Sequence, residues 1–173
     1  MCSLFQDFVF LCGYNLQIPR MPAIKININE FISLSKTYPV FDVRSPGEYV
    51  HAQFPGAHSL PLFTNDERAI VGTAFKQQSR EQAIKVGLDF FGVKMRLMVE
   101  EVEAITSKYP NKIILVHCWR GGMRSAAVAW LLDMYGYKAF TLAGGYKAYR
   151  NWVLQQFGKP DRKSTRLNSS HSS

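Results

Sequence analysis

A cysteine, two arginines and two glycines stand close together in the stretch HCWRGGMRSAA, which contains Cys118, Arg120 and Arg124. A short apolar run, Ile113 to Val116, precedes them, and a helix-forming segment rich in alanine and leucine begins at about Arg124. Because the turn joins a strand to a helix, its backbone N–H groups and the helix dipole favour a bound anion. Two permanent cations in a loop without an acid lower the pKa of a thiol. We therefore predict a thiolate nucleophile beside an anion-binding loop.

Two other roles for this cysteine are available. Free cysteines are often inert core residues, but the loop arginines and glycines argue against that role here. A zinc site needs paired ligands, and the cysteines Cys2, Cys12 and Cys118 show no such spacing. We therefore expect no metal.

The elements that position this loop alternate between strand and helix patterns. Strands are expected at residues 24–28, 40–43, 57–60, 113–116 and 139–142. Helices are expected at about 29–38 with Asn29 as the cap, at 45–50 behind the SPGE capping box, at 81–108 with interruptions near Gly87 and Gly92, from 124, and at 144–157. Residues 63–79 predict a long irregular excursion with some helix. This order predicts an α/β fold with a central parallel sheet and helices on both faces.

One domain, residues 21–158, accounts for the patterned part of the chain. We interpret residues 1–20 as an extension ahead of an authentic start at Met21, although a genuine N-terminal strand or helix is the alternative. Residues 159–173 form a polar tail, and DRKSTRLNSSH within it resembles the translation of a common sequencing adapter. We interpret that tail as an artefact. Without residues 161–173 the formal net charge falls from +8 to +6, which permits an anionic partner.

Compartment and membrane association follow from composition. Three scattered cysteines do not form a disulfide framework, so we expect a reducing cytoplasm. No apolar run approaches the length of a membrane span, so we expect no membrane partner.

Several motifs together resemble the rhodanese domain: FDVRSPGEYVHAQFPGAHSLP, the Cys118 loop and TLAGGYKAYRNW, in the family order. More narrowly, VGTAFKQQSREQAIKVGLDFFGVKM and CWRGGMRS are similar to the bacterial tRNA 2-selenouridine synthase family. Members of that family join an N-terminal rhodanese domain to a C-terminal P-loop domain. This chain has no GxxxxGK[ST] motif, and we expect that its reading frame was cut near Pro160.

The resemblance implies a three-layer rhodanese-like fold and a specific reaction. Sulfur at the wobble 2-thiouridine of tRNA is replaced by selenium, with selenophosphate as the donor and an S-geranylated uridine on the route. Geranyl diphosphate is thereby implied for the full-length family, whereas this chain is expected to hold no cofactor. The expected partners are tRNA and selenophosphate.

The resemblance also implies roles for individual residues. Cys118 corresponds to the catalytic cysteine, which carries selenium or sulfur as an adduct. The anion-binding loop around the donor consists of Trp119, Arg120, Gly121, Gly122, Met123, Arg124 and Ser125. We expect a polar support beneath the loop from Asp42, Arg44 and Glu48. Basic side chains that either contact tRNA phosphates or form a solvated face are Lys76, Arg80, Lys85, Lys147 and Arg150.

The loop spacing leaves a second function open. Cys118 and Arg124 are separated by five residues, and together with His117 and Ser125 they fit the His-Cys-x5-Arg-Ser/Thr signature of cysteine phosphatases. A phosphatase needs a general acid, for which Asp66 or Glu67 are the candidates. A non-catalytic binding module would normally lack the cysteine or the loop arginine. Spacing alone does not choose between selenium transfer and phosphate hydrolysis, but the long match over residues 71–95 favours the selenium enzyme.

Overall fold

Five short parallel strands form one sheet in the computed structural model, which describes residues 23–157. The interpretations of residues 1–20 and 159–173 fall outside these described residues. The strands are β1 (Ile24–Ile26), β2 (Val40–Asp42), β3 (His58–Ser59), β4 (Ile113–His117) and β5 (Lys138–Leu142), in the spatial order β1-β5-β4-β2-β3. The central strand is therefore β4, which leads directly into Cys118.

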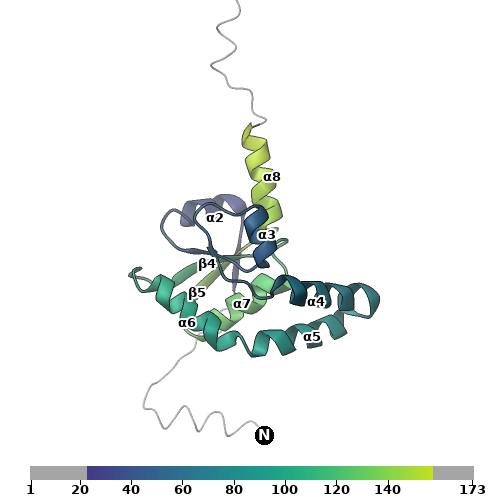
Figure 1. Cartoon of the computed structure of the whole chain (residues 1–173). Coiled ribbons are helices and arrows are strands. Elements are labelled where there is room, and N and C mark those ends of the chain that lie inside the picture. Colours follow the sequence, from purple (N-terminus) through teal and green to yellow (C-terminus); the bar gives the residue numbers. More distant parts are fainter. Residues whose placement is uncertain (1–22, 158–173) are drawn as a thin grey trace, which may run out of the picture.

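Helices cover both faces of the sheet (Figure 1). They are α2 (Ile28–Leu34), α3 (Pro46–His51), α4 (Asn65–Gln77), α5 (Arg80–Gly92), α6 (Met95–Thr106), α7 (Met123–Met134) and α8 (Gly145–Phe157). Alternating strand residues enter two separate cores, as the period of a strand requires. Ile114 and Val116 pack with α6 and α7, whereas Leu115 packs with Phe31 of α2 and Tyr149 of α8. The predicted α/β fold with a central parallel sheet between helical layers is confirmed.

The pairing register between β2 and β4 aligns the carboxyl ends of these two strands. Val40 pairs with Leu115, and Asp42 pairs with His117. The segments that follow β2 and β4 consequently begin at the same edge of the sheet, as ligand sites of parallel sheets require. This alignment brings the SPGE segment and the Cys118 loop together.

Local signals predicted some helices well and others poorly. The helix behind the SPGE segment is confirmed as α3, with Pro46 in its first turn and Glu48 bound to the backbone N–H of Ser45. The expected cap at Asn29 is wrong, because Asn27 caps α2 and accepts hydrogen bonds from the N–H groups of residues 29 and 30. The expected break at Gly87 is also wrong, since α5 runs through it.

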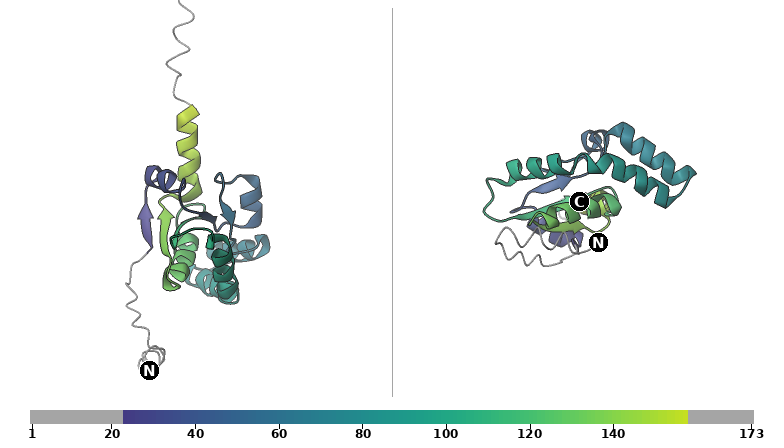
Figure 2. Two further views of the ribbon diagram at one scale, coloured as in Figure 1. Left: turned by 90° about the vertical axis from the view of Figure 1, so that its left-hand side faces the viewer. Right: turned by 90° about the horizontal axis from the view of Figure 1, so that it is seen from below.

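The region predicted as an irregular excursion is a regular helix, α4. Its N-terminus is capped by Thr64, whose hydroxyl accepts from the N–H of Glu67 while the Glu67 carboxylate accepts from the N–H of Thr64. The helix packs against α5, and the pair extends beyond the edge of the sheet (Figures 1 and 2). No helix within residues 23–157 has the length and apolar character needed to cross a membrane.

Candidate active site

The backbone of the loop at residues 118–124 is packed directly against the turn between β5 and α8. Gly121 and Gly145 both have positive φ angles, +64° and +60°. A Cβ atom on Gly145 would lie 2.3 Å from the carbonyl oxygen of Cys118, and one on Gly121 would lie 2.3 Å from that of Leu142. Only glycine permits both the left-handed conformation and this approach. The two glycines therefore fix the path of the loop.

Hydrogen bonds from the start of α8 hold the same loop in place. The N–H of Tyr146 donates to the Cys118 carbonyl at 2.8 Å, and the N–H of Lys147 donates to the Trp119 carbonyl at 3.0 Å. The half-buried Trp119 ring stacks on Tyr146 with a centroid distance of 5.9 Å. The N-terminus of α8 is thus occupied by carbonyl oxygens of the loop, which leaves the N-terminus of α7 facing the thiol.

Cys118 is a buried, free thiol whose surroundings favour its charged form. Burial raises its pKa, but the opposing interactions are larger, and the net pKa lies below the ordinary value. The lowering comes from the Ser125 hydroxyl, whose oxygen lies 3.3 Å from the sulfur, from the backbone N–H groups of Ser125 and Gly122, and from the Arg124 charge. Backbone donors at the start of α7 therefore stabilise a thiolate, as helix N-termini do.

A carboxylate from α3 approaches the loop arginine. Arg124 donates to Glu48 at 2.8 Å, and Glu48 also accepts from the Ser45 backbone and forms an ion pair with Arg68 at 3.1 Å. Burial raises the Glu48 pKa, but Arg124, Ser45 and Arg68 outweigh it, so its pKa is lowered. Glu48 belongs to the polar support expected beneath the loop, and it lies beside Arg124 although the two residues are 76 positions apart in sequence. Glu48 is a charged partner of Arg124 and a poor proton donor.

Asp42 and Arg44 form a fully buried pair beneath the loop. The guanidinium of Arg44 donates to both carboxylate oxygens of Asp42, and it also donates to the Ala52 carbonyl at 2.7 Å. Its flat face lies 4.0 Å from the centre of the Tyr146 ring. The pair therefore joins the end of β2 to the start of α8 without contacting the thiol.

His117 lies in the same buried layer. Its Nδ1 is 3.8 Å from an Asp42 oxygen, and neither ring nitrogen makes a hydrogen bond within the described part of the chain. Burial lowers the His117 pKa to about 4, against the opposing effect of Asp42. The imidazole is therefore neutral at physiological pH and does not act as a cation toward the thiolate.

The remaining predicted residues lie outside this cluster. Glu67 pairs with Lys94, and Asp66 is exposed at the start of α4, so the structure brings neither candidate acid onto the thiol. Arg120 and Met123 are exposed on the loop. The basic side chains proposed for tRNA phosphates, which are Lys76, Arg80, Lys85, Lys147 and Arg150, are all exposed.

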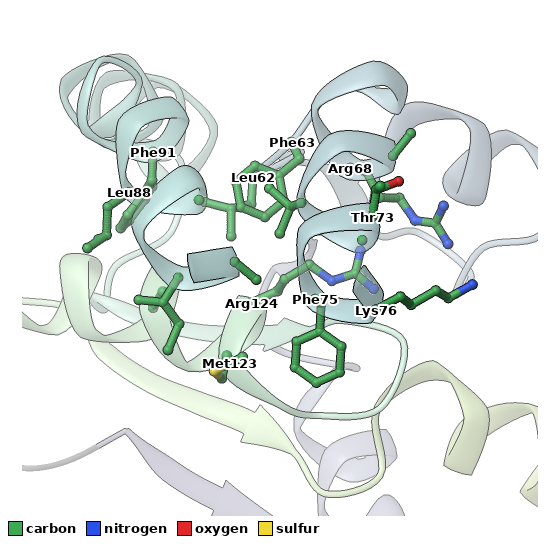
Figure 3. A pocket seen from close by; sticks show the side chains of 17 residues that line it. Leu62, Phe63, Arg68, Thr73, Phe75, Lys76, Leu88, Phe91, Met123 and Arg124 are labelled. Carbon is green, nitrogen blue, oxygen red and sulfur yellow. The ribbon is translucent and has the colours of Figure 1, made fainter. Parts of the chain in front are cut away.

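Sequence reasoning missed a cavity that adjoins the loop. A space of about 750 Å³ lies between α4, α5 and the start of α7, and its walls include Met123 and Arg124 (Figure 3). The apolar residues of α4 that face this space gave only a weak helical pattern in the sequence. The apolar side chains left exposed within residues 70–88 are recognisable only in the folded chain.

Among residues 23–157, no three His, Cys, Asp or Glu side chains gather in a way that could hold a metal ion.

Comparisons with known proteins place these features in context. The sequence model of the rhodanese-like domain matches residues 27–151. A tRNA 2-selenouridine synthase of Hydrogenovibrio crunogenus is 39% identical over 133 residues, which cover 75% of this chain and 36% of that protein. The corresponding protein of Bdellovibrio bacteriovorus is 38% identical over 120 residues, which cover 68% of this chain and 31% of that protein. The chain thus spans about a third of the length of these curated relatives.

One solved structure is similar to this chain over nearly its whole length, a larger share than in the two synthases. The crystal structure of the N-terminal domain of a protein from Clostridium difficile 630 superposes with a TM-score of 0.69 and 37% sequence identity. The match covers 75% of this chain and 98% of that domain.

Proposed function

The chain belongs to the rhodanese-like domain family, and on that premise we propose that it mobilises selenium for a tRNA 2-selenouridine synthase. The observation that carries this proposal is the lowered pKa of Cys118 within a loop that also presents Arg124. The similarity to synthases over residues that include this loop supports the same reaction. The proposed substrates are selenophosphate and the thiolated wobble uridine of tRNA.

Electron balance decides which atom of selenophosphate the thiolate attacks. Attack at selenium would send the P–Se electron pair to phosphorus and leave phosphite, a reduced product. Attack at phosphorus forms an S–P bond while the P–Se bond breaks, and the electron pair leaves with selenium as selenide. Phosphorus keeps its oxidation state in this second route. We therefore assign phosphorus as the atom that Cys118 attacks, in place of the attack at selenium and the selenium adduct that the family resemblance led us to expect.

The remaining steps restore the thiol and use the selenide. Water hydrolyses the cysteinyl phosphate, which releases inorganic phosphate and regenerates the Cys118 thiolate. Selenide, protonated by water to HSe⁻, forms a C–Se bond at the uridine as the C–S bond breaks and sulfur leaves as HS⁻. In the first step the backbone N–H groups of the loop and Arg124 hold the phosphoryl oxygens.

The second candidate function is hydrolysis of phosphate esters, and the site lacks the general acid that this reaction needs. An alkoxide leaving group needs a general acid, whereas HSe⁻ is a weak base and leaves without one. Glu48 is the carboxylate beside Arg124, and its lowered pKa keeps it ionised at neutral pH. Glu67 is paired with Lys94, and Asp66 is exposed at the start of α4. The site therefore suits selenophosphate better than an ester.

Mass spectrometry of the chain during incubation with selenophosphate tests this proposal. We expect a phosphoryl adduct on Cys118, release of selenide and inorganic phosphate, and none of these in Cys118→Ser. Replacing Arg124 with Ala should weaken capture of the anion by about 2–4 kcal/mol. Phosphite as the product, with selenium on the cysteine, would contradict attack at phosphorus. Rapid, Cys118-dependent hydrolysis of an alkyl phosphate would favour the phosphatase instead.

The alkylation rate of Cys118 against pH tests the state of the thiol. Because the hydrogen bonds of the loop lower its pKa, the midpoint should lie below the ordinary value of about 8.5. Ser125→Ala removes the hydroxyl beside the sulfur and should shift the midpoint upward. A midpoint at or above 8.5 in the unmodified chain would remove the basis for a nucleophilic Cys118.

A further inference from the structure

Asp42 and Arg44 form a buried ion pair that the proposed reaction does not use. The exposed fraction is 1% for Arg44 and 0% for Asp42, and neither side chain is among the groups that stabilise the Cys118 thiolate. A buried ion pair is seldom more stable than apolar side chains of similar volume, because both charges lose their hydration. Stability alone therefore does not explain why these two charges are buried.

The guanidinium of Arg44 is held along its edge and offers its flat face to an aromatic ring. Its Nε donates to both carboxylate oxygens of Asp42, at 2.9 and 3.0 Å, and its Nη2 donates to the Ala52 carbonyl at 2.7 Å. Its central carbon lies 4.0 Å from the centre of the Tyr146 ring. A cation is attracted to the face of such a ring, and more strongly where water is excluded. Because Tyr146 is only 7% exposed, this contact fixes its ring relative to the end of β2.

The backbone of Tyr146 is bonded to the residue that carries the thiol. Its N–H donates to the Cys118 carbonyl at 2.8 Å. The carbonyl and the side chain of Cys118 leave the same Cα atom, so their directions are coupled. Loss of this hydrogen bond would let the peptide rotate and would turn the sulfur away from the backbone donors at the start of α7.

We propose that Arg44 is a positioning residue for the Cys118 nucleophile and that it acts through the Tyr146 ring. The contacts form a continuous series: Asp42 orients the guanidinium, the guanidinium locates the ring, and the N–H of the same tyrosine holds the Cys118 carbonyl. The half-buried Trp119 ring stacks on Tyr146 and supports it from within the loop. A nucleophile reacts well only when such neighbours hold it close to its productive geometry. The inference rests on the nucleophilic role given to Cys118 in the proposed function.

Removing both charges together tests Arg44 without leaving a buried charge unpaired. In the double variant Asp42→Asn/Arg44→Met, the amide oxygen can still accept from the backbone N–H of residue 44, and methionine fills much of the space of the arginine. We expect thermal unfolding close to that of the unmodified chain. Alkylation of Cys118 at pH 7 should nevertheless be about 10-fold slower, the scale of one cation–π contact inside a protein, and its pH midpoint should rise. The rate is measured on the peptide that contains Cys118, so that Cys2 and Cys12 do not contribute.

Substitutions at Tyr146 separate the effect of the ring from that of the N–H group. Tyr146→Phe keeps the ring and should retain the alkylation profile. Tyr146→Leu keeps the N–H but loses the ring, and it should raise the pH midpoint as the double variant does. If the charges act through the ring, adding Tyr146→Leu to the double variant should change the profile little further.

Tyr149→Leu is the matched control on the same helix. The Tyr149 ring lies 5.7 Å from the Tyr146 ring and packs against Phe54 at 4.5 Å, in the core beneath α8. Its loss should lower the melting temperature and leave the pH midpoint of Cys118 in place. A merely structural role for Arg44 would produce the same result, so the midpoint is the measurement that separates the two roles.

An unchanged pH midpoint in the double variant or in Tyr146→Leu, with thermal unfolding showing a folded protein, would overturn the positioning role. An equal rise in Tyr149→Leu would overturn it too, because any loss of packing near the loop would then act on the thiol. If the double variant does not fold, Tyr146→Leu decides the question.

The two proposals fail in different ways. A raised midpoint in these variants, without any adduct from selenophosphate on the unmodified chain, would leave the positioning role standing and reject the proposed reaction. A normal phosphoryl adduct on Cys118, with an unchanged midpoint in the variants, would reject the positioning role alone.

Discussion

On one side of the Cys118 loop, the turn between β5 and α8 approaches so closely that a single methyl group on Gly145 would overlap the Cys118 carbonyl. On the other side, α4 and α5 leave a space of about 750 Å³ next to Arg124. The first side buries Asp42, Arg44 and His117 completely. The second side leaves Leu88 and Phe75 more than half exposed.

The difference separates two requirements of one site. The closely packed side fixes the backbone donors that set the thiol pKa, and it does so through contacts with little room to adjust. The open side contributes few buried contacts, so its residues are free to determine which ligand enters. We therefore expect substitutions on the packed side to change the stability of the fold. Substitutions on the open side should change ligand specificity and leave stability nearly unaltered.

The largest effect should come from adding one methyl group on the packed side. In Gly145→Ala, alanine would have to adopt a left-handed backbone conformation. Its methyl group would also overlap the Cys118 carbonyl and the loop N–H groups. We expect a loss of about 2–5 kcal/mol in the free energy of unfolding, measured by urea titration. Gly56→Ala is the control, because Gly56 also has a positive φ of +72° but meets no neighbour within 4 Å. It should cost only about 1–2 kcal/mol. Equal losses would show that packing at the loop is not close.

Acid should destabilise the packed side through His117. The folded-state pKa of His117 is about 4 and the ordinary pKa of histidine is about 6.5, so the unfolded chain takes up a proton first as the pH falls. Stability is therefore fully present above about pH 6.5 and decreases toward pH 4, by on the order of 3 kcal/mol. His117→Leu should remove this part of the pH dependence, as seen from urea unfolding at both pH values. Parallel pH profiles for the two proteins would contradict a neutral, buried imidazole.

The smallest effect on stability should come from the open side. Leu88 is 57% exposed and lines the cavity, so Leu88→Ala should change the free energy of unfolding by less than about 0.5 kcal/mol. Leu132→Ala, at a fully buried position of α7, should lose about 2–5 kcal/mol. A large loss at Leu88 would mean that the Leu88 side chain is packed in the core, which would end the contrast between the two sides.

Local sequence signals predicted the framework of the fold well. The apolar run at Ile113 predicted the central strand, and the capping box at Ser45 predicted α3, because both signals lie within a few residues. Helix α4 was predicted only as some helix within an irregular excursion, for a physical reason. Its apolar residues face the cavity rather than a closed core, so its pattern lacks the regular stripe of a buried face.

From the residues alone, the site could be predicted only where its parts are contiguous, and the support from Asp42, Arg44 and Glu48 was expected only through the family resemblance. The glycines, arginines and cysteine of residues 118–124 form one loop, and their spacing indicated an anion site beside a thiol. The pairing of Arg124 with Glu48 joins segments 76 residues apart, and it depends on the register between β2 and β4. No local pattern encodes that register, so neither this pairing nor the cavity could be predicted before the fold was known.

The hydrogen bonds from Tyr146 and Lys147 to the Cys118 loop have a consequence for protein synthesis. The residues that donate them are translated after the cysteine that they position. Until the start of α8 has left the ribosome, a nascent chain contains the thiol but not the contacts that shape its loop. The loop around Cys118 therefore reaches its final conformation only when α8, the last helix of the described chain, docks against it.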